Sequence, residues 1–206
     1  MKIITISREF GSGGRELGKR LADYLGFDYY DREIIIAIAQ KYELDENYVE
    51  EALDQDLLKD IPITYGRTLS YFVPCTPYST SLLLAEQQKV IEMLAGRKDC
   101  IIVGRSADVI LEHYQPFRLF VHADMESKIE RCRKRASTEE QLSDRDLARD
   151  IRKVDKARAN HHELFSEIPW GDKRGYDLCV NTTNRDPKIL VPAIGEYAKC
   201  WFDSRA

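Results

Sequence analysis

A glycine-rich turn near the start of the chain has the residues needed to bind a phosphate group. The segment ISREFGSGGREL follows the apolar opening MKIIT, so we expect a strand to pass into a helix there. Glycines in such a turn let backbone N–H groups converge on phosphate oxygens, and the start of the helix adds partial positive charge. The candidate phosphate loop consists of Gly11, Ser12, Gly13, Gly14, Arg15 and Glu16.

The usual cation of a phosphate-binding loop is missing from this turn. A lysine followed by Ser or Thr normally completes the loop, with the lysine on the terminal phosphates and the hydroxyl on Mg²⁺. Gly14 and Arg15 stand at these two positions. Arg15 can supply a cation with bidentate reach, and Arg8 ahead of the loop can supply another. The alternative interpretation is a tight turn that binds no ligand.

Five short apolar segments alternate with helical patterns and predict the fold class. Such alternation is typical of an α/β protein, in which helices cover both faces of a parallel sheet. Ligands of these sheets bind at the carboxyl ends of the strands, where we expect the glycine loop, Asp31, Arg105 and Asn181. The expected strands are 2–7, 27–30, 100–103, 117–122 and 176–182.

Capping residues mark the starts of several expected helices. Asp31 and Asp45 precede helices expected at 32–42 and 46–53, and Ser143 with Asp146 forms a capping-box-like start for a long basic helix to 163. Further helices are expected at 17–25, 80–94, 125–136 and from Pro187 after Asp186. Residues 54–79 have no clean period and predict a loop-rich insertion.

Composition excludes several function classes. The net charge of −4 disfavours a protein that binds nucleic acid through bulk positive charge. Residues 128–158 nevertheless hold eleven Lys and Arg against seven acids, which suits a compact polyanion. The five cysteines include no C-x-x-C pair, so neither a disulfide framework nor a zinc site is expected. With no signal peptide and no membrane helix recognised, the expected location is the cytoplasm.

The order of these segments resembles the cytidylate kinase-like family of P-loop nucleoside monophosphate kinases over nearly the whole length. The similar segments are ITISREFGSGGRELGKRLADYLGFDYYDREII, CIIVGRSADVIL, FRLFVHADMESKIERCRKR, DIRKVDKARANHHELF and YDLCVNTT. The resemblance implies one domain over 1–206 with a P-loop NTPase-like three-layer fold and a five-stranded parallel sheet. It also implies two mobile parts, an acceptor-binding insertion at 31–97 and a lid at 133–150.

The resemblance also implies an activity and a set of site residues. The activity is transfer of the γ-phosphoryl of ATP, with Mg²⁺, to a nucleoside monophosphate such as CMP. The implied catalytic residues Arg152 and Arg158 match the family's lid pattern, and Arg15 joins them as the candidate cation in place of the missing lysine. The implied acceptor-binding residues are Asp31, Arg105, Ser106 and Asp155, and Arg131 and Arg135 are implied at the donor base and lid. No firm metal ligand emerges, although Glu9, Glu16 or Asp31 could hold the ion through water.

Two departures from the family keep other functions open. The loop lacks its lysine, and Ser106 stands where cytidylate kinases carry the Asp of Gly-Arg-Asp. The alternatives are a nucleotide- or phosphate-binding protein without catalysis and a small-molecule kinase with a non-nucleotide acceptor. The expected partners are ATP and a small phosphorylated acceptor, with a homodimer allowed and with neither membrane nor nucleic acid polymer. His161 and His162 are expected to be solvent-exposed rather than metal ligands.

Overall fold

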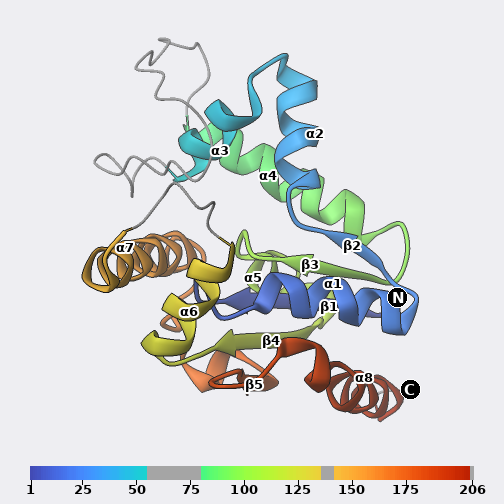
Figure 1. Ribbon diagram of the computed structural model, residues 1–206. Helices are drawn as coiled ribbons and strands as arrows, with labels where there is room; N and C mark the ends of the chain where they lie inside the picture. The colour runs from blue at the N-terminus through green and yellow to red at the C-terminus, as the bar shows by residue number, and fades with distance from the viewer. Residues whose placement is uncertain (55–79, 136–141, 205–206) are drawn as a thin grey trace.

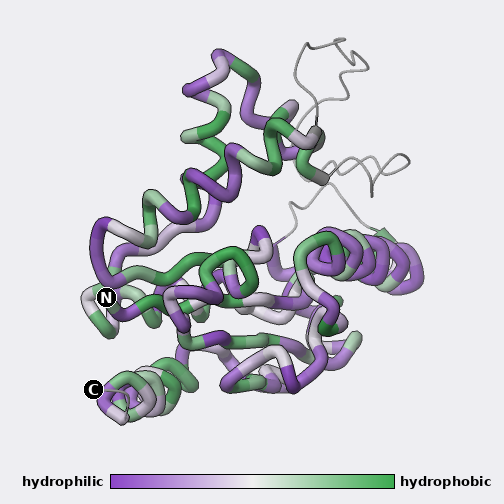
Figure 2. Tube along the Cα trace, turned by 180° about the vertical axis from the view of Figure 1, so that it is seen from behind, coloured by the Kyte–Doolittle hydropathy of each residue, from purple (hydrophilic) through white to green (hydrophobic). Residues whose placement is uncertain are grey.

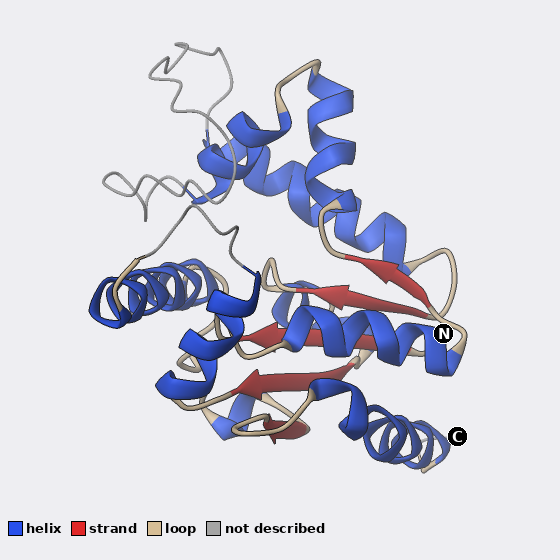
Figure 3. Cartoon of the chain, viewed as in Figure 1, coloured by secondary structure: helices blue, strands red, loops and turns tan. Residues whose placement is uncertain are grey.

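The chain folds around one sheet of five parallel strands. The computed structural model describes residues 1–54, 80–135 and 142–204. The strands lie in the order β2-β3-β1-β4-β5, and their arrows run in the same direction in Figure 3. Their bounds are β1 Ile3–Arg8, β2 Asp28–Tyr30, β3 Cys100–Val103, β4 Phe117–His122 and β5 Leu178–Asn181. The predicted strands therefore agree with the structure to within two residues at each end.

Helices connect the strands and cover the sheet. Figure 1 shows α2, α3 and α4 grouped beyond the β2 edge, with α6 and α7 near the carboxyl ends of the strands. The helices are α1 Gly14–Leu25, α2 Glu33–Tyr42, α3 Glu46–Asp54, α4 Thr80–Ala95, α5 Ala107–Ile110, α6 Met125–Arg135, α7 Asp144–Glu163 and α8 Pro187–Asp203. Two short 3₁₀ helices, η1 Glu112–Tyr114 and η2 Lys173–Gly175, complete the described elements.

Alternate residues of the central strands point into two separate cores. Ile3 and Ile102 pack in a core that includes residues of α2, α3 and α4, whereas Ile4, Ile6 and Ile101 pack in a core with α1 and α8. All five side chains are at most 1% exposed. The sheet is therefore the middle of three layers, and it holds the carboxyl ends of β1 and β3 side by side.

Most of the expected helix caps are confirmed. The Asp45 carboxylate accepts from the backbone N–H of Asn47, at 2.9 Å, and Ser143 Oγ accepts from that of Asp146, at 3.2 Å. The prediction for Asp31 as a cap was wrong. Arg32 occupies the N-cap position of α2 with no side-chain cap bond, and the Asp31 carboxylate turns instead to two arginines.

The regions predicted as the acceptor-binding insertion and the lid are described only in part. Helices α2, α3 and α4 lie in the predicted insertion, while residues 55–79 lie outside the described chain. Of the predicted lid, the structure describes the end of α6 and the start of α7, but not 136–141. The tube in Figure 2 is purple and pale over most of α7, which marks that helix as polar. None of the helices in the described ranges is long and apolar enough to cross a membrane.

The cap of α8 supports a first prediction, because α8 packs on α1, the helix that follows the phosphate loop. Asp186 accepts from the N–H of Lys188 at 3.0 Å, and Pro187 occupies the first helical position. Asp186→Ala is expected to lower the free energy of unfolding by about 1 kcal/mol, because a helix N–H loses its acceptor. Urea denaturation measures this change, and Asp186→Asn should retain most of the stability.

Candidate functional site

A cavity of about 490 Å³ opens at the carboxyl ends of β1 and β3. Its walls are the phosphate loop, the turn at 104–106 and one face of α7. Of the residues predicted from the sequence, the structure brings eleven to this cavity: Arg8, Glu9, Gly11, Gly13, Gly14, Arg15, Arg105, Ser106, Arg131, Arg135 and Arg158. Ser12, Glu16, Asp31, Arg152 and Asp155 do not line it, although Ser12, Asp31 and Asp155 support residues that do.

The phosphate loop has the backbone conformation that only glycine adopts at low cost. Gly11 and Gly13 have φ angles of 76° and 82°. A Cβ atom on Gly13 would lie 2.5 Å from Cγ of Pro187, so both space and conformation require glycine there. Ser12 is fully buried, and its carbonyl accepts from Thr182 Oγ1 at 2.7 Å. The loop is thus held against the start of α8, with the N-terminus of α1 facing the cavity as a source of N–H donors.

Arginines converge beside this loop on a single carboxylate. Arg8 Nη2 lies 3.7 Å from Asp31 Oδ1, and Arg15 Nε pairs with the other oxygen of Asp31. Arg158 Nη1 donates to the Arg8 carbonyl at 3.0 Å. Burial, and next the charge of Arg158, lower the pKa of Arg8 to about 9, with Arg15 and Arg105 acting in the same direction. The region carries an excess of positive charge that an anionic ligand would balance.

The turn after β3 is left-handed over three residues. Gly104, Arg105 and Ser106 have φ angles of 79°, 58° and 52°. This conformation places Arg105 on the cavity wall with its side chain 15% exposed, 3.8 Å from Glu50 of α3. Two consecutive side-chain-bearing residues in the left-handed region are uncommon, and such conformations cluster at functional sites.

The carboxylates near the loop are already engaged. Glu9 pairs with Lys128 at 2.6 Å, Glu16 pairs with Arg20 and Arg135, each at 3.0 Å, and Asp31 pairs with Arg8 and Arg15. Within the described ranges no three His, Cys, Asp or Glu side chains gather as a metal site. Magnesium with ATP still fits this donor set, because Mg²⁺ is usually held by substrate phosphates, waters and only one or two carboxylates.

The comparison with known proteins agrees with this architecture. A family model described as "Cytidylate kinase-like family" matches residues 3–184. The chain belongs to the cytidylate kinase-like family. A cytidylate kinase from Haloarcula marismortui is 22% identical over 201 residues, covering 95% of this chain and 91% of the relative.

Solved structures place this cytidylate kinase-like chain on the P-loop kinase fold. An uncharacterized protein from Eubacterium ventriosum is 26% identical with a TM-score of 0.66, covering 97% of this chain and 99% of that chain. A shikimate kinase from Bacteroides thetaiotaomicron is 14% identical with a TM-score of 0.57, covering 96% and 98% of the two chains. The fold predicted from the sequence is therefore confirmed.

In this cytidylate kinase-like chain, a buried lysine that was not predicted from the sequence holds the residues next to the phosphate loop. Lys128 of α6 is 4% exposed and contacts Asp155 at 3.0 Å as well as Glu9. Asp155 Oδ1 also accepts from the N–H of Phe10 at 2.6 Å. Burial raises the pKa of Asp155, while the Phe10 N–H and Lys128 oppose that shift. The helical spacing of three between Lys128 and Arg131 was the available signal, since it puts both on the face of α6 that meets the loop.

The two arginines assigned to the donor base and lid have different surroundings. Arg131 donates to the carbonyl of Arg185 at 2.8 Å, to that of Gly11 at 3.3 Å and to that of Thr182, so it joins α6 to the loop and to the segment after β5. Burial, followed by the charge of Arg135, lowers the pKa of Arg131. Arg135 is more than half exposed and pairs with Glu16. Arg131 is thus a fixed wall of the site, and Arg135 is a rim residue.

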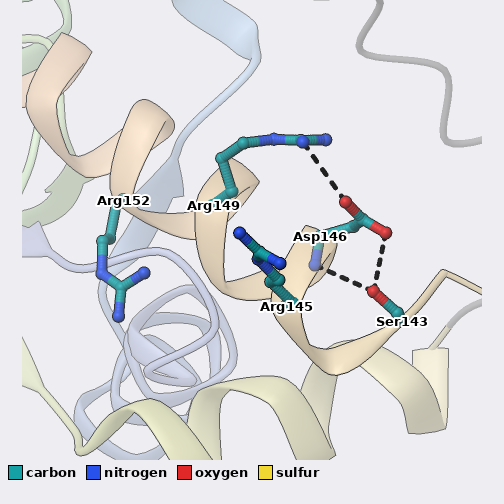
Figure 4. Close-up of a pocket in the computed structure, with 5 residues that line it drawn as sticks. All are labelled: Ser143, Arg145, Asp146, Arg149 and Arg152. Carbon is teal, nitrogen blue, oxygen red and sulfur yellow. Dashed lines mark hydrogen bonds and ion pairs between the residues drawn. The ribbon is translucent and has the colours of Figure 1, made fainter.

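In this cytidylate kinase-like chain, Arg152 does not line the cavity at the carboxyl ends of β1 and β3. It lines a separate surface pocket of about 620 Å³ with Ser143, Arg145, Asp146 and Arg149. Figure 4 shows Arg149 reaching Asp146, at 3.2 Å, while Arg152 points away from that pair. The Arg152 side chain is exposed and does not line the cavity that the phosphate loop and Arg105 share.

The two histidines of α7 are buried, so the prediction that they are solvent-exposed was wrong. His161 Nδ1 lies 3.0 Å from Ser106 Oγ, and His162 Nε2 lies 3.0 Å from Asp108 Oδ2. The histidines are 6% and 5% exposed. His161 continues, at helical spacing, the buried stripe that includes Ile151, and that periodicity was the available signal. The pair joins α7 to Ser106 of the left-handed turn and to Asp108 of α5.

Proposed function

We propose that the chain transfers the γ-phosphoryl group of ATP to a nucleoside monophosphate or a related small phosphorylated acceptor. One observation carries the proposal: Arg8, Arg15, Arg105 and Arg158 lie together between the glycine loop and the turn after β3. Phosphoryl transfer needs little covalent help from the enzyme, but it needs positioning and positive charge around the transferring group. This part of the cavity offers both.

The residues divide into a donor side and an acceptor side. The backbone of the phosphate loop holds the β- and γ-phosphates of ATP, with Arg15 and Arg158 on their oxygens. Arg105 binds the acceptor phosphate from the opposite wall. When bound, Mg²⁺ neutralises charge on the donor phosphates, with Glu9, Glu16 or Asp31 holding it through water. An acceptor oxygen then bonds to the γ-phosphorus as the bond to the β,γ-bridging oxygen breaks, and ADP leaves with the electron pair.

CMP is the first acceptor to test, because a relative from Haloarcula marismortui is named a cytidylate kinase. Ser106, hydrogen-bonded to His161, stands where that family's Gly-Arg-Asp places a carboxylate, so the acceptor base need not be cytosine. A coupled assay of ADP release with ATP and magnesium, over CMP, dCMP, UMP, AMP, GMP and small alcohols, identifies the acceptor. Turnover with an alcohol alone would replace the proposal by a small-molecule kinase.

Arg105→Ala is expected to raise KM for the acceptor by about 10-fold to 100-fold, because a charge-assisted hydrogen bond to a phosphate is worth roughly 1.5–3 kcal/mol. KM for ATP should change little. Arg97→Ala is the matched control, since Arg97 is exposed and its described side-chain contact is the sulfur of Met93 at 3.7 Å. Unchanged acceptor KM in the Arg105 variant would contradict the site assignment. ATP protection against heat without turnover on any acceptor would favour a binding protein.

We also propose a cytoplasmic location. Cys100, Cys132, Cys179 and Cys200 are free thiols, as expected for a reducing compartment that supplies ATP. Labelling of the four thiols in cell extract prepared under acid quench tests this directly, because an oxidising compartment would leave them blocked.

A further inference from the structure

We propose that Arg8 is the catalytic cation of this site and that it takes the place of the missing loop lysine. The inference rests on the proposed function and assigns the residue that touches the transferring phosphoryl group. Arg8 is the last residue of β1 and lines the cavity with its side chain 15% exposed. The loop residues assigned from the sequence leave this charge to Arg15, but the geometry points to Arg8.

The Arg8 side chain occupies space that a side chain at position 14 would need. A Cβ atom on Gly14 would lie 2.6 Å from Cβ and 3.1 Å from Cγ of Arg8. Gly14 is the first residue of α1 and has an ordinary helical φ, so its backbone would accept any side chain. The closest obstacle to a lysine is therefore the Arg8 side chain, and Cβ of Val121, at 3.2 Å, adds a lesser one. A side chain at position 14 and the Arg8 side chain compete for the same space, which gives a steric reason for the missing lysine.

The other end of the Arg8 side chain lies against the backbone at Gly104. A Cβ atom on Gly104 would lie 1.9 Å from Nη1 and 2.9 Å from Cζ of Arg8. The guanidinium therefore rests on a bare stretch of backbone after β3, the neighbouring strand. Its side chain spans from the start of α1 to the wall that carries Arg105, and so lies between the donor and acceptor sides of the cavity.

The electrostatic surroundings of Arg8 differ from those of Arg15. Arg15 is more than half exposed and directs Nε to Asp31. Arg8 is only 15% exposed, and its Nη2 lies 3.7 Å from the same carboxylate, beyond hydrogen-bond distance. Arg158 donates to the backbone of Arg8, so it adds positive charge at close range. Arg8 keeps its proton at neutral pH but lacks a full counter-charge, and a fixed, desolvated cation of this kind binds developing negative charge well.

The proposed step keeps Arg8 protonated throughout. An oxygen of the acceptor phosphate forms a bond to the γ-phosphorus of ATP, and the bond between that phosphorus and the β,γ-bridging oxygen breaks. ADP departs with the electron pair, and no proton is needed at a dianionic acceptor phosphate. Arg8 donates hydrogen bonds to the equatorial oxygens of the phosphoryl group as it moves, which favours the transition state over either bound nucleotide.

The test exchanges the cation between the two positions. Arg8→Met, which removes charge but keeps bulk, is expected to lower kcat by about 100-fold or more with less than about 10-fold change in either KM. R8G/G14K removes the obstacle and restores a loop lysine, so it should recover at least about 10-fold of kcat over R8G. G14K alone should be inactive because both side chains compete for the same space. Arg97→Gly is the matched control.

A second readout does not depend on the acceptor. ADP with aluminium fluoride and magnesium mimics the phosphoryl group in transit, so it should raise the melting temperature of the wild-type protein above the value with ADP alone. Arg8→Met should keep the ADP shift and lose the extra shift. This measurement separates the two proposals. If the wild-type protein shows the extra shift but turns over no acceptor on the panel, only the proposed acceptor class is contradicted, and the assignment of Arg8 can still be tested.

Three results would overturn the assignment of Arg8. The first is kcat within about threefold of wild type in a folded Arg8→Met protein. The second is a loss confined to KM, which would make Arg8 a binding residue. The third is an equal effect of aluminium fluoride on the melting temperatures of the wild-type and Arg8→Met proteins. The absence of an extra shift in both proteins counts as an equal effect. Circular dichroism melting of each variant shows that it is folded, and R8G/G14K provides the answer if Arg8→Met does not fold.

Discussion

Alanine at position 104 is expected to reduce kcat/KM by about 100-fold or more while leaving the fold intact. Gly104 has a φ of 79°, and a Cβ atom there would collide with Nη1 of Arg8 at 1.9 Å. The guanidinium would have to leave its position between the phosphate loop and Arg105. The left-handed backbone adds about 1 kcal/mol of strain, so the melting temperature should fall by a few degrees at most.

A second glycine with positive φ, Gly26, serves as a control that separates backbone strain from the steric clash with Arg8. Gly26, at the end of α1, has a similar φ of 71°, but a Cβ atom there would meet nothing within 4 Å. Gly26→Ala should therefore lose about the same stability as Gly104→Ala through strain, and keep wild-type activity. Steady-state kinetics with the acceptor found above, together with thermal melts of both variants, make the comparison. Equal activities in the two variants would contradict the importance of the Arg8 position.

Lys128→Met is expected to destabilise the protein by about 3–5 kcal/mol, because it leaves two carboxylates at a buried site without their cation. The Lys128 ammonium contacts Glu9 at 2.6 Å and Asp155 at 3.0 Å, and its side chain is 6% exposed. Glu9 and Asp155 in turn hold the backbone N–H groups of Ala123 and Phe10, so the phosphate loop should loosen as well. Weaker protection by ATP should accompany the lower stability.

The same helix supplies the control. Lys134 pairs with Glu130 at 2.6 Å, but both side chains are more than 60% exposed. Lys134→Met should therefore change the free energy of unfolding by less than about 0.5 kcal/mol. Urea denaturation of both variants, with m-values compared, provides the measurement. Similar midpoints for Lys128→Met and Lys134→Met would show that the buried ion pairs are not needed for stability.

The fold could be predicted from the sequence because its signals are local. Short apolar runs marked the strands, and side-chain caps such as Asp45, Ser143 and Asp186 marked helix starts, each through contacts with residues two or three positions away. The prediction for Asp31 failed because capping chemistry competes with tertiary contacts. An aspartate beside two arginines from other elements satisfies its charge there rather than at the helix end.

The candidate site depended on contacts that no spacing reveals. The loop, Arg105 and Arg158 were predicted and lie at one cavity, since parallel strands gather their carboxyl ends at one edge. The space between Gly14 and Gly104 is different, because it exists only when β1 and β3 are neighbours. Lys128 and the two histidines are intermediate cases. Helical spacing could have placed Lys128 and His161 on inward faces, but it could not show that Lys128 meets Glu9 and Asp155 or that His161 meets Ser106.

The left-handed turn at 104–106 has a consequence for how this protein can be improved. Each side-chain-bearing residue held in that conformation costs about 1–2 kcal/mol, and Arg105 and Ser106 are adjacent. If variants were selected for thermal stability alone, we expect early substitutions of Arg105 and Ser106 by residues that accept a positive φ at lower cost. Arg105 lines the cavity and Ser106 is hydrogen-bonded to His161, so such variants would gain thermal stability and lose catalytic turnover together. The turn is therefore a place where thermal robustness and catalytic rate compete directly.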